Sequence, residues 1–329
     1  MSATTPSDRA TFEVLTPGLS TTVQDRGRFG HYNVGLPQGG SLDNYSSQAA
    51  NMLVGNSPDE AVLECTYMGA NLRFDSAATI AVTGGDIDVT VNGEPAPTWQ
   101  TVEVPAGGTV EFGMLRSGAR FYIAVHGGVD VPVVLGSRST YPLGQMGGFN
   151  GRKLEVGDVL PIGDGSGEAP NRTVVDEAAR PSFAKQQDVR ILMGLYDFRL
   201  TETGKRSLVE GEWELTPVAD RAGLRYKGPG VEWVEREQPF GAGSDPSNIV
   251  DAGYAVGSIQ IPGGTQPIVL HRDAVSGGGY AMVATVISAD MDLVARATPG
   301  TTTRFVEVTM EEALAARREY KDAVAALWE

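Results

Sequence analysis

The fold class is indicated by residues 61–128, which read AVLECTYMGANLRFDSAATIAVTGGDIDVTVNGEPAPTWQTVEVPAGGTVEFGMLRSGARFYIAVHGG. Short runs rich in β-branched and aromatic residues alternate here with turn signals at intervals of about eight to twelve residues. Such spacing is typical of a sandwich or barrel of antiparallel strands. Asn92-Gly93 is predicted to form a hairpin turn. The stretch therefore predicts a mainly β protein.

Strand-like runs continue on both sides of this stretch. Upstream, Thr11–Leu15 is predicted to be a short strand, and downstream Leu154–Leu160 is predicted to form a hairpin that closes the first half. Residues 189–194 resemble residues 12–18, a similarity too short to establish a repeat but compatible with two β units. The strand-like runs of the second half are EWELTPV, GLRYKG, SIQIPG, QPIVLHR, YAMVATVI and TRFVEVT.

Two segments have helical patterns. Residues 42–54 are predicted to form a helix of about three turns, with Asp43 or Ser41 as its N-cap. Residues 310–328 are predicted to form a C-terminal helix, because Thr309 and Glu312 have the spacing of a capping box. The apolar stripe predicted for that helix consists of Met310, Leu314, Tyr320, Val324, Leu327 and Trp328.

The polar segment 163–188, rich in Gly, Pro and Ala, is the best candidate for a domain boundary. The predicted organisation is a disordered lead over residues 1–10, an N-terminal β unit over 11–165, a linker over 166–188, and a C-terminal β unit over 189–329. A chain of 329 residues is long enough for two such units, each with its own core.

Composition excludes several classes of protein. The net charge of −15 argues against nucleic acid or an anionic membrane as the main partner. Cys65 is the single cysteine, so an intramolecular disulfide cannot form, and its place in an apolar run predicts a buried, inert thiol. No apolar run approaches the length that spans a bilayer, and the residues at the start of the chain lack an apolar core. We expect a cytoplasmic protein.

Motifs of self-sufficient enzymes are absent from the sequence. There is no phosphate-binding P-loop, no strand-linked dinucleotide fingerprint and no nucleophile elbow. The three histidines are scattered without metal-ligand spacing, so no metal site is predicted. No local motif indicates an enzyme that works alone.

Three polar, glycine-rich blocks stand out, at residues 17–43, 136–152 and 257–290. In the first block, Arg26 and Arg28 flank a glycine beside a carboxylate, a pattern that suits contact with an anion. The second and third blocks also offer hydrogen-bond donors where glycines let backbone approach a ligand. The alternative for the first two blocks is surface loops, the first with a local ion pair.

His271 and Asp273 in the third block allow two interpretations. His271 near Asp273 could be a general base held in orientation by a carboxylate. A surface histidine at the end of a strand is the interpretation that the residues alone favour.

The blocks together resemble a known family. The segments GLSTTVQDRGRFGHYNVGLPQGGSLD, QAANMLVGN, AVLECTYMGANLRF, LGSRSTYPLGQMGGFNGRKLEVGD and GSIQIPGGTQPIVLHRDAVSGGGYAMVATVISAD are similar to the allophanate hydrolase subunit 2 family, also called the biotin-dependent carboxyltransferase or KipA-like family. The resemblance covers roughly residues 12 to 308, with the blocks in the same order. Residues 38–43 and 275–281 depart from the family's usual runs, while keeping small residues.

The resemblance implies a cyclophilin-like β-barrel and a chain that works with partners. The implied function is the C component of an ATP-dependent 5-oxoprolinase, which converts 5-oxoproline, ATP and water to L-glutamate. Its implied partners are a KipI-like B component, of the allophanate hydrolase subunit 1 family, and the A component of the 5-oxoprolinase. One alternative is the carboxyltransferase component of a biotin-dependent urea or amide carboxylase. Another is a non-enzymatic KipA-like regulator that binds a KipI-like kinase inhibitor.

The chain itself carries no recognisable cofactor motif. The complex would use ATP, and biotin would enter only under the carboxyltransferase alternative. The polar blocks and the resemblance together predict site residues whose loops share one cleft. The predicted catalytic residues are Asp25, Asp43, Asp273 and His271. The predicted groups that contact substrate are Arg26, Arg28, Arg138, Ser139, Thr140, Gln260, Arg272 and Tyr280.

Overall fold

The computed structural model describes residues 9–165, 170 and 172–329. Residues 1–8 of the predicted lead, and residues 166–169 and 171 of the predicted linker, lie outside the described residues. The chain divides into two compact units. Unit 1 contains the described residues of Met1–Arg28, Gly39–Phe183 and Ala323–Glu329, and unit 2 contains Phe29–Gln38 and Ala184–Asp322.

Unit 1 is built from two antiparallel sheets, with strand orders β11-β1-β4-β9-β6-β7 and β2-β3-β10-β5-β8. Apolar side chains of both sheets pack into one core that includes Phe12, Phe74, Val110 and Phe121. The alternation seen in the sequence produces this core, because successive residues of a strand point to opposite faces. The strands are β1 (Thr11–Thr16), β2 (Ser20–Gln24), β3 (Val62–Thr66), β4 (Asn71–Phe74), β5 (Ala78–Asp86), β6 (Val89–Val91), β7 (Glu94–Ala96), β8 (Thr101–Val104), β9 (Thr109–Phe112), β10 (Ser117–Val125) and β11 (Val159–Pro161).

The predicted hairpin at Asn92-Gly93 is confirmed. It joins β6 to β7, and both residues have positive φ angles, 52° and 82°. Two central residues with positive φ form a type I′ turn, whose twist matches that of the flanking strands.

The hairpin predicted at Leu154–Leu160 is wrong. Only Val159–Pro161 forms a strand, which pairs with β1. The preceding residues form a turn instead, because the Asp158 carboxylate accepts hydrogen bonds from the Glu155 N–H and from the guanidinium of Arg152. These local bonds replace the ladder that a hairpin would need.

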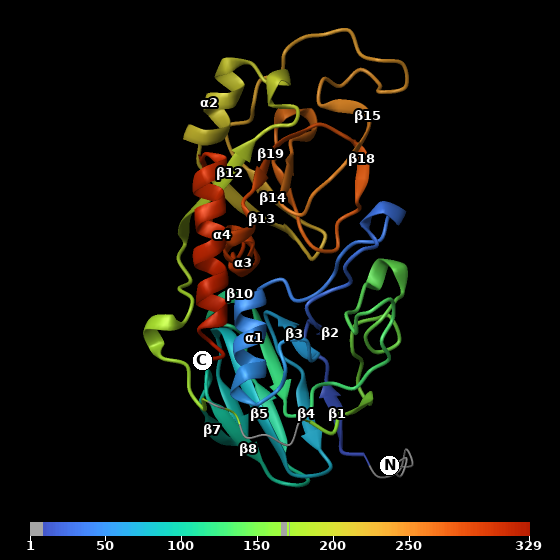
Figure 1. The fold of residues 1–329 in the computed structure, drawn as a ribbon, viewed down its shortest axis with the longest axis vertical. Helices are drawn as coiled ribbons and strands as arrows, with labels where there is room; N and C mark the ends of the chain where they lie inside the picture. Colours follow the sequence, from blue (N-terminus) through green and yellow to red (C-terminus); the bar gives the residue numbers. More distant parts are fainter. Residues whose placement is uncertain (1–8, 166–169, 171) are drawn as a thin grey trace. The chain divides into compact units, whose positions relative to one another are not determined.

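The first predicted helix is confirmed as α1 (Asn44–Leu53), and Asp43 is its N-cap. The Asp43 carboxylate accepts from the Ser46 N–H at 3.1 Å and from the Ser46 hydroxyl at 2.6 Å. The helix packs against β5 and β10 (Figure 1), and its residues from Ser46 to Leu53 are all buried. A capped helix at this position fixes the end of the glycine-rich block that precedes it.

Unit 2 is organised around a closed barrel with strand order β12-β19-β16-β17-β14-β13-β20, and a two-stranded sheet formed by β15 and β18. The barrel core includes Trp213, Tyr226 and Phe305, whose side chains are fully buried. The prediction of a mainly β fold with a barrel is confirmed. The strands are β12 (Gln186–Met193), β13 (Trp213–Ala219), β14 (Gly223–Lys227), β15 (Asn248–Gly253), β16 (Ser258–Gln260), β17 (Ile268–Leu270), β18 (Gly277–Tyr280), β19 (Met282–Val286) and β20 (Thr302–Glu307).

Three further α-helices lie along the second half of the chain. The helices α2 and α3 are not predicted from the sequence, and α2 begins after Thr201, whose hydroxyl accepts from the Gly204 N–H at 3.0 Å. Among the described residues, no helix is both long enough and apolar enough to cross a bilayer. The helices are α2 (Glu202–Glu210), α3 (Met291–Arg296) and α4 (Met310–Ala325), and the short 3-10 helices are η1 (Tyr32–Val34), η2 (Pro142–Gly144), η3 (Glu177–Ala179), η4 (Asp197–Arg199), η5 (Pro262–Gly264) and η6 (Ser288–Asp290).

The predicted cap of the C-terminal helix is confirmed, and its predicted apolar stripe is confirmed only in part. The Thr309 N–H and hydroxyl both donate to the Glu312 carboxylate. The helix is buried through Ala313 and Ala316, whereas Met310 is 55% exposed. Within α4 the buried residues are two alanines, so the predicted burial of Met310 and Leu314 is wrong, whereas Leu327 is buried as predicted and Trp328 packs in the same cluster.

Candidate functional site

The first two polar blocks meet at the carboxylate of Asp25, at the end of β2. Its Oδ1 accepts from the Gly27 N–H at 2.8 Å and from the Ser137 hydroxyl at 2.7 Å. The Ser139 hydroxyl donates to Oδ1 as well, and the Arg138 N–H donates to Oδ2. Asp25 is 9% exposed. The carboxylate therefore ties two loops together that are separated by more than one hundred residues.

The guanidinium of Arg28 strengthens the same junction. Its Nε donates to the Val134 carbonyl at 3.1 Å, and its Nη2 donates to the Ser139 carbonyl at 3.0 Å. Thr140 donates from both its N–H and its hydroxyl to the Val23 carbonyl at 2.9 Å. Arg28, Ser139 and Thr140 are buried. The predicted contacts of these residues with a substrate stay predictions, and the contacts seen here are those of a brace.

A glycine in the second block explains how closely these loops approach. A Cβ added to Gly148 would lie 1.8 Å from Oγ1 of Thr140. Gly148 also has a φ of 54°, a backbone angle that residues with a side chain rarely adopt. Glycine is therefore required here by the packing of the loop on Thr140.

The remaining predicted residues of unit 1 are divided between the surface and the helix cap. The Arg26 side chain is 49% exposed and pairs with Asp59 at 3.1 Å. The Arg138 side chain is 24% exposed and pairs with Asp130 at 2.9 Å. Asp43 is buried as the cap of α1. Of the predicted groups in unit 1, Arg26 and Arg138 are thus the two whose charged ends reach solvent.

A further buried carboxylate, that of Glu64 on β3, was not predicted to have a role. Its Oε2 accepts from the Leu42 N–H at 2.8 Å and from the Tyr122 hydroxyl at 2.9 Å. The Tyr122 hydroxyl in turn accepts from the Asp43 N–H at 2.8 Å. Burial, followed by the charges of Glu64 and Asp43, raises the pKa of Tyr122 well above its usual range, so this phenol stays protonated. The network holds the residues that lead into α1.

Cys65, next to Glu64, is fully buried, which confirms its predicted burial. Burial raises the pKa of its thiol to about 11. A thiol with such a pKa carries almost no thiolate at neutral pH, so it is a poor nucleophile.

In unit 2, the predicted residue Asp273 pairs with Arg221. The Arg221 Nε donates to Oδ2 at 2.7 Å and its Nη2 donates to Oδ1 at 2.9 Å. Both side chains are largely buried, 13% and 7% exposed for Arg221 and Asp273. A two-bond pair of this kind fixes both groups. Sequence reasoning missed Arg221, because it lies 52 residues away and no local signal connects the two.

His271 is fully buried and bonded through both ring nitrogens. Its Nδ1 accepts from the Arg272 N–H at 2.9 Å, and its Nε2 lies 3.3 Å from the Met291 carbonyl. This network assigns the neutral form with the proton on Nε2. The predicted role as a general base stays a prediction, and the interpretation as a surface histidine is wrong because the ring has no exposure.

Gln260 and Tyr280 differ in their exposure, and so in whether a ligand could reach them. Gln260, at the end of β16, is buried. Tyr280 ends β18 and is 43% exposed, while its N–H donates to the Tyr254 hydroxyl at 2.8 Å. Arg272, which stands between His271 and Asp273 in the sequence, is half-buried. These residues lie in unit 2 and the Asp25 junction lies in unit 1, so the predicted shared cleft stays a prediction.

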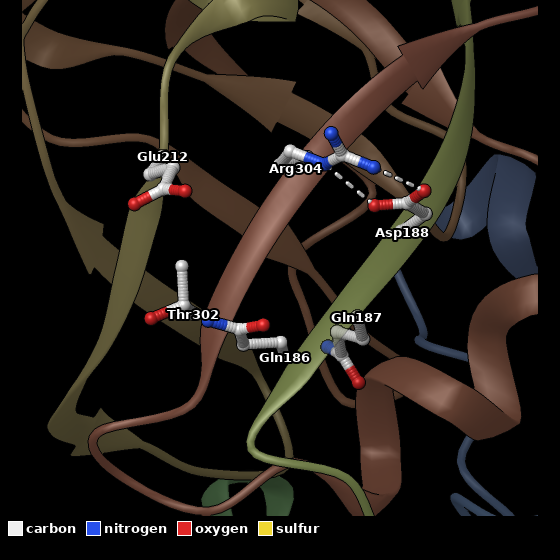
Figure 2. A pocket seen from close by; sticks show the side chains of 6 residues that line it. All are labelled: Gln186, Gln187, Asp188, Glu212, Thr302 and Arg304. Atoms are coloured by element: carbon white, nitrogen blue, oxygen red, sulfur yellow. Dashed lines mark hydrogen bonds and ion pairs between the residues drawn. The ribbon is translucent and has the colours of Figure 1, made fainter.

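Unit 2 also contains an open polar groove of about 480 Å³. Figure 2 shows Asp188 on β12 facing Arg304 on β20, with two hydrogen bonds at 2.8 and 2.7 Å between them. None of the predicted site residues lines this groove. Its lining consists of Gln186, Gln187, Asp188, Glu212, Thr302 and Arg304.

The predicted site groups are of types that can recognise a carboxylate or an amide. Within the described ranges, no group of three or more His, Cys, Asp or Glu side chains could hold a metal ion. Arginines, hydroxyls and an amide are donors for a carboxylate or amide ligand.

Comparisons with known proteins agree on one family. Residues 34–307 match the family described as carboxyltransferase domain, subdomain A and B. The C component of the 5-oxoprolinase of Escherichia coli (strain K12) is 31% identical over 93% of this chain and 94% of its own length. The urea amidolyase of Saccharomyces cerevisiae is 33% identical over 96% of this chain, which spans 18% of that relative.

The solved structures agree with the sequence matches. The crystal structure of the K. lactis urea amidolyase superposes with a TM-score of 0.91 and 33% identity, over 98% of this chain and 20% of that one. The chain thus spans about a fifth of the length of the urea amidolyases that it matches. It belongs to the carboxyltransferase domain family, subdomains A and B, as its resemblance to the biotin-dependent carboxyltransferases predicts.

Proposed function

We propose that this chain is the C component of an ATP-dependent 5-oxoprolinase, which opens the lactam of 5-oxoproline to give L-glutamate. The observation that carries the proposal is the extent of one match: the C component of the Escherichia coli 5-oxoprolinase is covered over 94% of its length. A second relative of that name, from Haemophilus influenzae, is covered to the same extent at 30% identity.

The name of these relatives describes a part of a multi-subunit enzyme, and the proposal assigns partners accordingly. The chain would act with a KipI-like B component and an A component, and the complex would use ATP. The sequence has no phosphate-binding loop. In this proposal another component of the complex binds the nucleotide. The complex would work in the cytoplasm.

Within the complex, the exposed predicted residues are the best candidates to contact the substrate. The substrate 5-oxoproline carries a carboxylate and an amide. Arg26 and Arg138 in unit 1 could receive the carboxylate, since their guanidinium groups reach solvent. Tyr280 in unit 2 could donate to the amide oxygen, because it is the predicted residue of that unit with the most exposed side chain. The buried carboxylates Asp25 and Asp273 would hold the loops that carry these groups.

The proposal is tested by reconstitution from purified components. The chain is combined with its A and B components, and glutamate release from 5-oxoproline is followed with and without ATP. We expect release that requires all three components and ATP. Turnover that is unchanged when this chain is omitted would overturn the proposal. Tight binding of the B component without turnover would instead favour the regulatory alternative.

The second candidate function is the carboxyltransferase component of a biotin-dependent urea or amide carboxylase. It is favoured by a specific observation, the TM-score of 0.91 with the K. lactis urea carboxylase structure at 33% identity. Biotin on a carrier would then be the group that delivers the carboxyl. A biotin carboxylase and a biotin carrier encoded beside the gene would favour this candidate.

A further inference from the structure

An arginine in unit 2 is buried without a carboxylate partner. Arg199 ends η4 and is 2% exposed. Its Nη1 donates to the Asn248 carbonyl at 3.0 Å, and its Nε, which is buried, has no hydrogen-bond partner. In the described part of the chain, Arg199 forms no ion pair with an acidic side chain. A buried charge left in this state is costly, and native proteins normally pair it.

A second guanidinium converges on the same place. The Oε1 of Gln238 accepts from Nη2 of Arg236 at 2.9 Å and from Nη2 of Arg199 at 3.4 Å. The Nε2 of Gln238 donates to the Asp245 carbonyl at 2.7 Å, which fixes the amide with its oxygen toward the two arginines. Two cations therefore share one neutral acceptor.

The surroundings leave the positive charge uncompensated. The Cζ of Arg199 lies 5.8 Å from the centre of the Tyr196 ring, whose face offers a weak attraction to a cation. Burial, followed by repulsion from Arg236, lowers the pKa of Arg199. Arg236 itself is exposed, so solvent reaches the site from its side.

We propose that Arg199 and Arg236 form a binding site for an oxyanion, a carboxylate or a phosphate, whose place is held by Gln238 in the free protein. An oxyanion there would accept from both guanidinium groups and supply the negative charge that the amide oxygen lacks. The Nε–H of Arg199, which has no partner, is the donor available for a two-bond contact with a planar oxyanion.

The variant Gln238→Glu tests this geometry directly. It places a carboxylate where the oxyanion would bind, so we expect it to remove the response to added oxyanion. Its own unfolding midpoint is not the readout, because the substitution also replaces the amide that donates to the Asp245 carbonyl with an oxygen that cannot donate. Arg236→Gln removes an exposed donor, and we expect it to weaken the apparent affinity at least tenfold (about the effect of one charge-assisted contact). Arg304→Gln is the matched control, because it removes one exposed arginine charge elsewhere in unit 2.

The measurement is the thermal unfolding midpoint of the full chain, titrated with sodium phosphate and separately with sodium acetate against sodium chloride of equal ionic strength. We expect a saturable rise with at least one of the two oxyanions in the wild-type chain and in Arg304→Gln. The salt that saturates at the lower concentration identifies phosphate or carboxylate as the preferred ligand. A wild-type response no larger than that to chloride, or equal responses in wild type and Gln238→Glu, would overturn the proposal.

Discussion

Replacing Asp25 by asparagine should lower the free energy of unfolding by about 3 kcal/mol, because the carboxylate accepts buried hydrogen bonds from both loops that it joins. Asparagine keeps the shape but turns one oxygen into an NH₂ group that faces donors. Each lost bond to a charged group is worth about 1.5–3 kcal/mol, and neighbouring losses are not additive. Equilibrium denaturation in urea measures the change.

The matched control for this substitution is Asp59→Asn. Asp59 also pairs with an arginine of the first polar block, but its side chain is 75% exposed. An exposed pair contributes about 0–1 kcal/mol, so the control should be nearly unchanged. If Asp25→Asn were as stable as the wild type and yet abolished turnover in the reconstituted complex, Asp25 would be a catalytic residue rather than a brace.

Replacing Asp273 by asparagine should have an effect of similar size in unit 2. The substitution leaves the largely buried Arg221 without its two-bond carboxylate partner. Removing one member of a buried pair costs about 3–5 kcal/mol, because the remaining charge stays desolvated. Thermal and urea unfolding of the full chain would both show the loss.

Asp188→Asn is the control that matches this pair in geometry but not in burial. Asp188 receives two hydrogen bonds from Arg304, and the two side chains are 51% and 56% exposed. We expect a loss of less than about 1 kcal/mol. Equal losses for Asp188→Asn and Asp273→Asn would contradict the assignment of Asp273 to a buried structural pair.

The fold could be predicted where the deciding interactions are local. The hairpin at Asn92-Gly93 and the caps of α1 and α4 each depend on residues within a few positions, and all three are confirmed. The hairpin predicted at Leu154–Leu160 is wrong although the deciding hydrogen bonds of Asp158 are local, because the turn that they form was not recognised. The stripe predicted for α4 is wrong in part, because distant packing decides it. The face that α4 buries is set by its neighbours, which select Ala313 and Ala316 over larger side chains.

The candidate site could be predicted only in part, for the same physical reason. Composition singled out the blocks that contain Asp25 and Ser139, but not their direct contact, since it joins residues 114 positions apart. Arg199 gave no signal, because a lone arginine in a sequence does not reveal that it is buried without a carboxylate. Burial and long-range pairing come from the whole fold.

The central claim is that this chain serves 5-oxoproline hydrolysis rather than urea carboxylation. The most direct measurement compares the two substrates with this chain reconstituted in two ways, once with its A and B components and once with a biotin carboxylase and a biotin carrier. The account predicts ATP consumption that requires this chain and 5-oxoproline, and that is matched by glutamate release. ATP consumption that depends on urea and bicarbonate, without glutamate release from 5-oxoproline, would contradict it.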